Sequence, residues 1–163
     1  MRIGVLSDTH LVSPNQRLEY ILEELLGSDD IVLHAGDIVS GRVLDRLEVK
    51  SVIAVCGNMD DSEVARALPQ KRIIPVAGMR IALIHGWGGK RGLEERLVAR
   101  LKPDDPDIIV YGHSHVPYWA EVQGTMMFNP GAALHNPYAE GGSVGRIEIV
   151  DGHVEAAFLP VNR

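Results

Sequence analysis

Five short polar clusters occur along the sequence, and each follows directly after an apolar run. The clusters contain aspartate, histidine and asparagine, whose carboxylate, imidazole and amide oxygen groups bind divalent transition metals. Mixed His and Asp ligands suit Mn, Fe, Ni, Co or Zn. One ion does not need so many donors, whereas two ions that share a bridging carboxylate would use all of them. The candidate ligands are Asp8, His10, Asp37, Asn58, His85, His113 and His115.

Taken singly, each cluster also has an ordinary structural explanation. Asp8 could cap a turn or a helix, and Gly36-Asp37 and Gly57-Asn58 are common turn sequences. His85 fits a hydrogen-bonded core position equally well. His113-Ser114-His115 is more specific, because two histidines around one residue can point toward one centre. The metal hypothesis is favoured because the structural explanations would have to hold independently for the cluster at the end of every strand.

Three other residues receive structural predictions. His34 lies inside a predicted strand and is expected in the core or behind the site. His153, in the terminal hairpin, is expected to be exposed. Cys56 is interpreted as a small buried apolar residue. Because Cys56 is the only cysteine, an intrachain disulfide and a cysteine-ligated zinc site are both excluded.

The first part of the chain predicts parallel strands that bring the clusters together. Apolar runs indicate buried strands over residues 3–6, 31–35 and 51–55. Helical spacing of apolar residues separates these strands, over residues 15–26 and again over residues 43–47. Strands that alternate with helices imply parallel βαβ units. Ligands bind beyond the carboxyl ends of such strands, so the polar clusters are expected to converge there.

The second part of the chain is richer in predicted strands. A helix is expected after Gly92, and a buried strand over residues 107–110 ends at Gly112. Turn signals at Ala77-Gly78, Gly124 and Asp151-Gly152 indicate three hairpins. These hairpins are expected over residues 72–84, 118–128 and 146–159.

Length and composition limit the class of protein. A chain of 163 residues predicts one domain, over residues 1–163. The net charge of -6, without a Lys/Arg-rich run, argues against a nucleic-acid-binding face. The first apolar stretch is broken by Asp8 and is too short for a signal peptide or a membrane span. A single cysteine fits a reducing compartment, so a cytoplasmic location is expected. The sequence leaves the oligomeric state open, a homo-oligomer included.

In their order along the chain, the clusters resemble the calcineurin-like metallophosphoesterase superfamily, and within it the small phosphodiesterases of bacteria and archaea. The matching blocks are Asp8-x-His10, Gly36-Asp37, Gly57-Asn58, His85-Gly86 and Gly112-His113-Ser114-His115. Asn129-Pro130-Gly131 also matches, so the similarity runs from Met1 to at least Gly131. The resemblance implies an α/β fold, namely a four-layer αββα sandwich of two mixed β-sheets flanked by helices.

The resemblance also implies roles for the candidate ligands. Asp8, His10 and His115 would hold one metal, Asn58, His85 and His113 the other, and Asp37 would bridge them. The cofactors would be two divalent metal ions. Mn²⁺ is the favoured ion, and Ni²⁺, Fe²⁺, Co²⁺ and Zn²⁺ are the alternatives. Ions about 3.5 to 4 Å apart make a hydroxide available for attack on a phosphate ester.

Three residues are expected to act on the substrate. Asn58 and His113 are the predicted catalytic residues. Asn58 is also a predicted substrate contact, because its amide nitrogen is free to donate when its oxygen binds metal. His135 is expected to line the mouth of the site and to contact the substrate.

Two positions depart from the family pattern. Many members carry a histidine where Met59 stands, and that histidine is thought to assist the leaving group, whereas a methionine carries no proton. The small type often continues after Gly131 with a serine and then a Pro-Arg pair, which is absent here. The source of the last proton and any substrate contact by that arginine are therefore open.

The function expected from the sequence is a dinuclear-metal-dependent phosphodiesterase that hydrolyses small phosphate esters by attack of a metal-activated hydroxide. One alternative is a non-enzymatic protein-interaction scaffold, because the retromer scaffold subunit resembles the same fold. The scaffold subunits lack one of the metal-ligand histidines, whereas every matched ligand is present in this sequence. A phosphomonoesterase or nucleotidase is the second alternative, because the same hydroxide attacks both ester classes. The expected partner is a small phosphate-ester substrate, without nucleic acid and without membrane.

Overall fold

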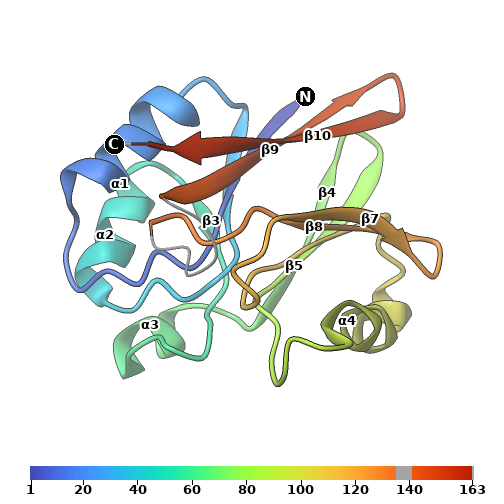
Figure 1. Cartoon of the computed structure of the whole chain (residues 1–163), viewed down its shortest axis with the longest axis horizontal. Helices are drawn as coiled ribbons and strands as arrows, with labels where there is room; N and C mark the ends of the chain where they lie inside the picture. The colour runs from blue at the N-terminus through green and yellow to red at the C-terminus, as the bar shows by residue number, and fades with distance from the viewer. Residues whose placement is uncertain (135–140, 163) are drawn as a thin grey trace.

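The computed structural model describes residues 1–134 and 141–162 and contains two five-stranded sheets that pack face to face. Helices α1 and α2 cover the outer face of one sheet, and α4 covers the outer face of the other (Figure 1). The layers follow the order helix, sheet, sheet, helix. This arrangement confirms the αββα sandwich that the resemblance implied.

The first sheet has the strand order β10-β9-β1-β2-β3. Its strands are β1 (Arg2–Leu6), β2 (Ile31–His34), β3 (Ile53–Ala54), β9 (Gly142–Val150) and β10 (His153–Val161). β1, β2 and β3 are parallel, as the sequence predicted, and β9 joins the other side of β1 in the antiparallel sense. The terminal hairpin therefore completes the sheet that the first strands begin.

The second sheet has the strand order β4-β5-β6-β8-β7. Its strands are β4 (Lys71–Val76), β5 (Met79–Ile84), β6 (Ile108–Val110), β7 (Tyr118–Val122) and β8 (Thr125–Asn129). β5, β6 and β8 are parallel, while β4 and β7 are antiparallel edge strands. All three predicted hairpins are confirmed.

Alternating side chains along β5 belong to two separate parts of the core. Ile81 and Leu83 of β5 belong to the cluster packed between the two sheets. Their neighbours Ala82 and Ile84 face the other way and pack with α4. Successive side chains of a strand point to opposite faces, so a strand that is apolar throughout must be covered on both sides. The continuous apolar runs in the sequence thus reflect the middle layers of the sandwich.

The helices match the predicted pattern, with one exception. Asn15 caps α1 (Gln16–Tyr20), which continues as a π-helical turn, η1 (Ile21–Leu25). The other predicted helices are α2 (Gly41–Val49) and α4 (Leu93–Leu101), and a 3₁₀ turn, η2 (Lys102–Asp104), follows α4. The sequence missed α3 (Ser62–Ala67), because this short helix buries only Val64 and lacks a full apolar stripe. No helix in the described part of the chain is long and apolar enough to cross a membrane.

Three smaller predictions have mixed outcomes. His34 is fully buried and His153 is exposed, as expected. β3 is shorter than the predicted strand over residues 51–55, because only Ile53 and Ala54 pair with β2. Cys56 is half-buried rather than buried, and it lies in the wall of a surface cavity.

Candidate metal centre

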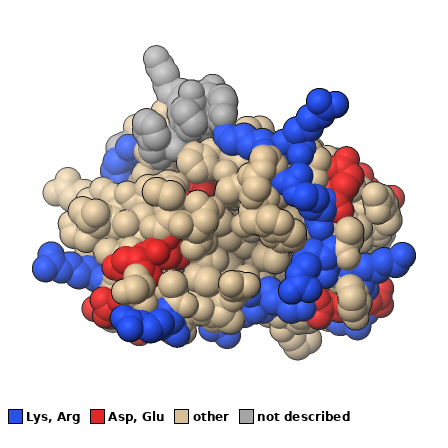
Figure 2. Space-filling model, turned by 90° about the horizontal axis from the view of Figure 1, so that it is seen from below, with Lys and Arg blue, Asp and Glu red and all other residues tan. Residues whose placement is uncertain are grey.

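The polar clusters follow β1, β2, β3, β5 and β6 and meet at one edge of the sandwich, where both sheets end. Backbone hydrogen bonds join neighbouring loops within each sheet. The amide of Asp8 donates to the carbonyl of Gly36 at 3.0 Å, and the amide of Gly112 donates to the carbonyl of His85 at 3.1 Å. The view from below shows a hollow in this face of the molecule (Figure 2). The convergence predicted from the strand ends is therefore present.

Asp8, His10 and His115 form the first group of candidate ligands. Oδ1 of Asp8 lies 3.1 Å from Nε2 of His115 and 3.8 Å from Nε2 of His10. The two imidazole nitrogens are 3.3 Å apart. Three atoms that can each offer an electron pair thus face a common point, which is the geometry that a bound cation needs.

Asn58, His85 and His113 form the second group, and hydrogen bonds fix how their atoms point. Nδ1 of His85 donates to the carbonyl of Ala35 at 2.8 Å, and Nε2 of His113 donates to the carbonyl of Gly88 at 2.7 Å. In the neutral rings the other nitrogens then carry lone pairs. These nitrogens lie 3.2 Å and 2.9 Å from Oδ1 of Asn58. Electron-pair donors therefore converge here as well.

Asp37 lies between the two groups. Its Oδ2 is 3.3 Å from Nε2 of His85 and 3.7 Å from Nε2 of His10. Its Oδ1 accepts a hydrogen bond from the amide of Met59 at 2.7 Å. Asp8 also forms a cluster with Asp37 and His85. The two groups of ligands are therefore in contact and are not two separate triads. Short contacts thus connect all seven predicted ligands.

The residues present fit a pair of divalent cations. The Asp8 side chain is fully buried, and its Oδ1 has no hydrogen-bond partner within the described part of the chain. Its Oδ2, in contrast, accepts from the Ser7 hydroxyl at 2.6 Å and from the His113 amide at 3.2 Å. A buried carboxylate oxygen without a donor is costly. A cation within reach of His10 and His115 would satisfy it.

Electrostatics favours cations at the same place. Burial raises the pKa of the Asp8 carboxyl, but the His115, His85 and Ser7 side chains outweigh burial and hold it below its usual range. Burial likewise opposes the ionisation of Asp37, yet contact with His85 and the Met59 amide lowers its pKa. Burial lowers the pKa of His85, whereas Asp37 and Asp8 raise it above the usual value. The centre therefore holds two buried negative charges at neutral pH.

Five of the seven ligands have a left-handed backbone conformation, which non-glycine residues rarely adopt. Each such residue costs on the order of 1 to 2 kcal/mol, and strain of this kind concentrates at functional sites. The surrounding hydrogen bonds must hold the ligand loops against this cost. The φ angles are 53° for Asp8, 49° for His10, 57° for Asp37, 68° for His113 and 62° for His115.

Two glycines of the clusters make room for the carboxylates. A Cβ atom on Gly57 would overlap Oδ1 and the backbone nitrogen of Asp37. A Cβ atom on Gly112 would overlap Oγ of Ser7 and Oδ2 of Asp8. The Gly-Asn and Gly-His pairs of the sequence thus reflect close approach of one ligand loop to another, not only turn chemistry.

Two buried or half-buried side chains support the ligand loops, and their roles were not predicted. Asn129 at the end of β8 donates to the Gly112 carbonyl at 2.8 Å and to Oγ of Ser114 at 3.0 Å. Asp60 accepts from the amides of Val39 at 2.6 Å and Gly57 at 2.7 Å. The available signals were the Asn129-Pro130-Gly131 match for Asn129 and, for Asp60, its position just after the Gly57-Asn58 cluster.

His34 stands behind the centre and not in it. Its Nδ1 accepts from the Gly36 amide at 3.1 Å, and its Nε2 lies 3.2 Å from the Thr9 hydroxyl. Desolvation of the fully buried ring lowers the pKa of His34 to about 3, so the ring is neutral. His34 therefore fixes the loops that carry Thr9 and Asp37. His135, the predicted substrate contact, lies outside the described residues.

The model of the calcineurin-like phosphoesterase superfamily domain matches residues 1–152, and the chain belongs to this family. Membership implies divalent metal ions and a phosphoester hydrolase, in agreement with the ligand geometry described above.

Two relatives of known sequence agree with this assignment, and one solved structure shares the fold. "Probable metallophosphoesterase MJ0623" of Methanocaldococcus jannaschii is 32% identical over 165 residues, which covers 99% of this chain and 82% of the relative. "Phosphodiesterase MJ0936" of the same organism is 28% identical over 80% of this chain and 83% of its own length. Vps29 of Entamoeba histolytica in complex with Zn²⁺ has a TM-score of 0.70 at 24% identity and covers 99% of this chain and 100% of that one. The likeness to Vps29 supports the fold alone.

Gly112→Ala is expected to weaken metal binding by about tenfold or more, because the added methyl group displaces Ser7 and Asp8 from their present contact. Gly89→Ala is the matched control, since no atom lies within 4 Å of the added Cβ and its φ is ordinary. Mn²⁺ titration by calorimetry measures both affinities. Equal affinities of the two variants would contradict the packing argument.

His34 is expected to make folding stability depend on pH. The pKa is 6.5 in the unfolded chain and about 3 in the folded chain, so the unfolded chain binds more protons between these values and stability falls as pH is lowered through this window. Between pH 7 and pH 5 the loss from His34 is about 2 kcal/mol. His34→Gln removes this contribution.

Urea unfolding at both pH values, with chelator present throughout, tests this difference. Chelator keeps acid-driven metal loss out of the comparison. The native chain should lose about 2 kcal/mol more than His34→Gln between pH 7 and pH 5. Identical losses would mean that the His34 ring is protonated or solvated in the folded chain.

Proposed function

We propose that the protein is a dinuclear-metal-dependent phosphodiesterase that hydrolyses small phosphate esters. The observation that carries this proposal is the buried Asp8 Oδ1 without a hydrogen-bond donor among the described residues, facing two imidazole nitrogens. Asp37 stands between this group and a second set of converging donors. A carboxylate in that position is what two neighbouring cations need as a bridge.

The ligand roles follow the two groups. Asp8, His10 and His115 hold one ion, and Asn58, His85 and His113 hold the other. Asp37 bridges them, supported by its distances to His10 and His85. We propose Mn²⁺ as the preferred ion, because mixed Asp, His and Asn donors suit a moderately hard divalent metal.

When bound, the two ions supply a nucleophile derived from water at neutral pH and neutralise charge on the phosphoryl oxygens. The chain's own residues orient the ester. With its Oδ1 directed at the ligand nitrogens, Asn58 keeps Nδ2 as a donor for a phosphoryl oxygen. His113 is held by the hydrogen bond from its Nε2 to the Gly88 carbonyl, so its Nδ1 keeps a fixed direction toward Oδ1 of Asn58.

A protein-interaction scaffold and a phosphomonoesterase are the alternatives. The likeness to Vps29 favours the scaffold only at the level of fold, while the complete set of candidate ligands favours an enzyme. The relative named as a phosphodiesterase favours the diesterase over the monoesterase. Parallel assays with bis(4-nitrophenyl) phosphate and 4-nitrophenyl phosphate separate the three functions. A cytoplasmic location, as the single cysteine suggests, is part of the same proposal.

Asp37→Asn is expected to remove nearly all diester hydrolysis, with a loss of at least 10³-fold in kcat. The substitution keeps the shape of the side chain but removes the charge between the two ligand groups. His34→Gln should lose less than tenfold, because Gln can replace the bond from Nε2 to Thr9. Steady-state kinetics at saturating Mn²⁺ measures both. Comparable losses in the two variants would contradict the bridging role of Asp37.

The rate is expected to depend steeply on the pKa of the leaving group. Met59 is 57% exposed beside the ligands and carries no proton, and both Asp60 oxygens accept backbone hydrogen bonds. General-acid assistance contributes about 10² to 10⁴ in rate, and good leaving groups need it least. Nitrophenyl diesters should therefore react much faster than alkyl diesters.

A series of diesters with increasing leaving-group pKa tests this expectation. Met59→His should accelerate the poor substrates selectively and flatten the dependence, whereas the control Met59→Gln should leave it steep. A native dependence already close to flat, with chemistry rate-limiting, would show that another residue donates the proton.

A further inference from the structure

A cavity of about 590 Å³ adjoins the candidate metal centre. Asn58 and His85 line one part of it, so a phosphate held at the centre would lie beside it. The volume lies within the range of ligand-binding pockets, roughly 300 to 1,000 Å³. The rest of the wall includes Trp87, Lys71 and Arg100. None of these three residues belongs to the metal ligands.

The wall of the cavity is positively charged although the chain is acidic. The protein has 22 Asp and Glu residues and a net charge of -6, yet none of the residues that line the cavity is acidic. Lys71 is neutralised by an ion pair with Asp104 at 2.5 Å. Arg100, on α4, is exposed, and its side chain makes no hydrogen bond or ion pair with any described residue. Lys and Arg side chains lie along one side of the hollowed face in Figure 2.

Trp87 offers an aromatic surface on the same wall. Its side chain is 41% exposed, so a flat ring can cover it. Arg96 donates to the Trp87 carbonyl at 3.1 Å, and His113 donates to the Gly88 carbonyl at 2.7 Å. The loop that carries Trp87 is thus attached both to α4 and to a metal ligand. Its position is therefore defined relative to the reacting phosphate.

We propose that this cavity binds one ester substituent of the substrate, and that this substituent contains an unsaturated ring and a second negatively charged group. Trp87 stacks on the ring, and Arg100 pairs with the charge. Stacking on an exposed aromatic side chain favours binding of a planar ring, and a free cation adds selectivity for an anion. This assignment rests on the proposed phosphodiesterase site, which it deepens by naming the class of substrate.

The test uses binding, so that it does not depend on turnover. 4-Phosphonobenzoate has a ring, a phosphonate and a carboxylate, while phenylphosphonate lacks the carboxylate, and neither has a P–O–C ester bond to hydrolyse. The chain has two tryptophans, and Trp119 packs against Phe128. Titration of the Mn²⁺-loaded protein, followed by tryptophan fluorescence, should show 4-phosphonobenzoate binding about threefold to tenfold more tightly.

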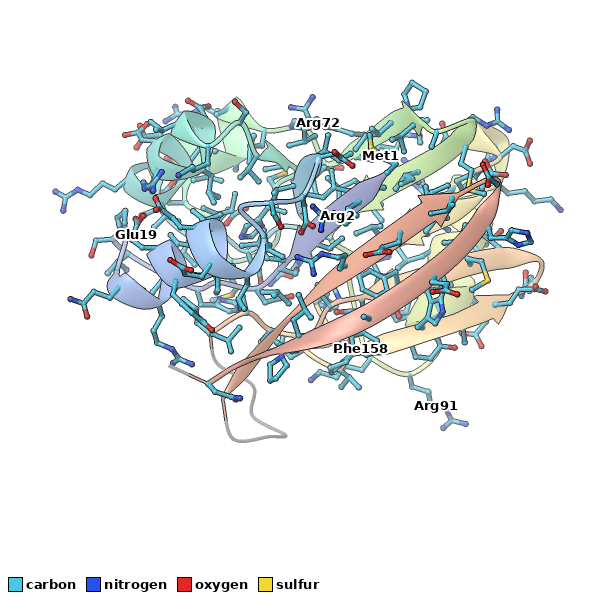
Figure 3. The ribbon with its side chains drawn as sticks, turned by 90° about the horizontal axis from the view of Figure 1, so that it is seen from above. Met1, Arg2, Glu19, Arg72, Arg91 and Phe158 are labelled. Carbon is cyan, nitrogen blue, oxygen red and sulfur yellow. The ribbon has the colours of Figure 1, made fainter. Side chains whose placement is uncertain are left out.

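Three variants assign the effect to residues. Arg100→Gln should abolish the preference for the carboxylate. Arg91→Gln should keep it, because the Arg91 side chain points away from the molecule (Figure 3) and does not line the cavity. Trp87→Phe should remove the fluorescence change, while calorimetry should show that most of the affinity is retained. The ligand should also slow alkylation of Cys56, which lines the cavity and is the only cysteine.

Equal affinity for the two phosphonates, or a preference that survives Arg100→Gln, would overturn the assignment and leave Arg100 as a solvated surface charge. Unchanged alkylation of Cys56 at saturating ligand would place the ligand elsewhere and would also overturn it. Failure of the phosphodiesterase proposal is recognised separately, by absence of diester hydrolysis in a protein that still binds 4-phosphonobenzoate with the expected preference.

Discussion

One hydrogen bond between the two sheets determines how the candidate metal centre is built. Nδ1 of His85, at the end of β5, donates to the carbonyl of Ala35, which follows β2, at 2.8 Å. This bond joins the sheets at the edge where the ligand loops meet. It also fixes the orientation of the ring, so that Nε2 is directed at Asp37 and Asn58. If the ring were flipped, Nδ1 would no longer contact the Ala35 carbonyl, and Nε2 would no longer point at Asp37 and Asn58.

The rest of the centre shows the cost of holding such groups together. Asp8 and Asp37 are buried and ionised, and five ligands have left-handed backbones. Neither feature stabilises the fold by itself. Asn129, Asp60 and His34 offset part of the cost by holding the loops, and bound cations would offset the repulsion between the carboxylates. The centre is therefore the region whose stability should respond most to metal.

The sequence predicted the strands of the parallel core, because buried strands are apolar throughout and end in turn residues. It also predicted which residues converge, since the carboxyl ends of parallel strands share one edge. Periodicity did not predict that the chain forms two sheets, because pairing of β9 with β1 spans almost the whole chain. It missed α3, whose single buried residue gives no period. The cavity beside the centre could not be predicted, because Lys71, Trp87 and Arg100 come from separate elements without a shared motif.

The central claim is that the donors at this edge hold two divalent ions joined by Asp37. The most direct measurement is equilibrium dialysis of the metal-stripped protein against Mn²⁺, with elemental analysis at saturation and electron paramagnetic resonance of the same samples. We expect two Mn²⁺ per chain and the spectrum of a magnetically coupled pair. Saturation at one Mn²⁺ per chain, or two ions without magnetic coupling, would contradict the account.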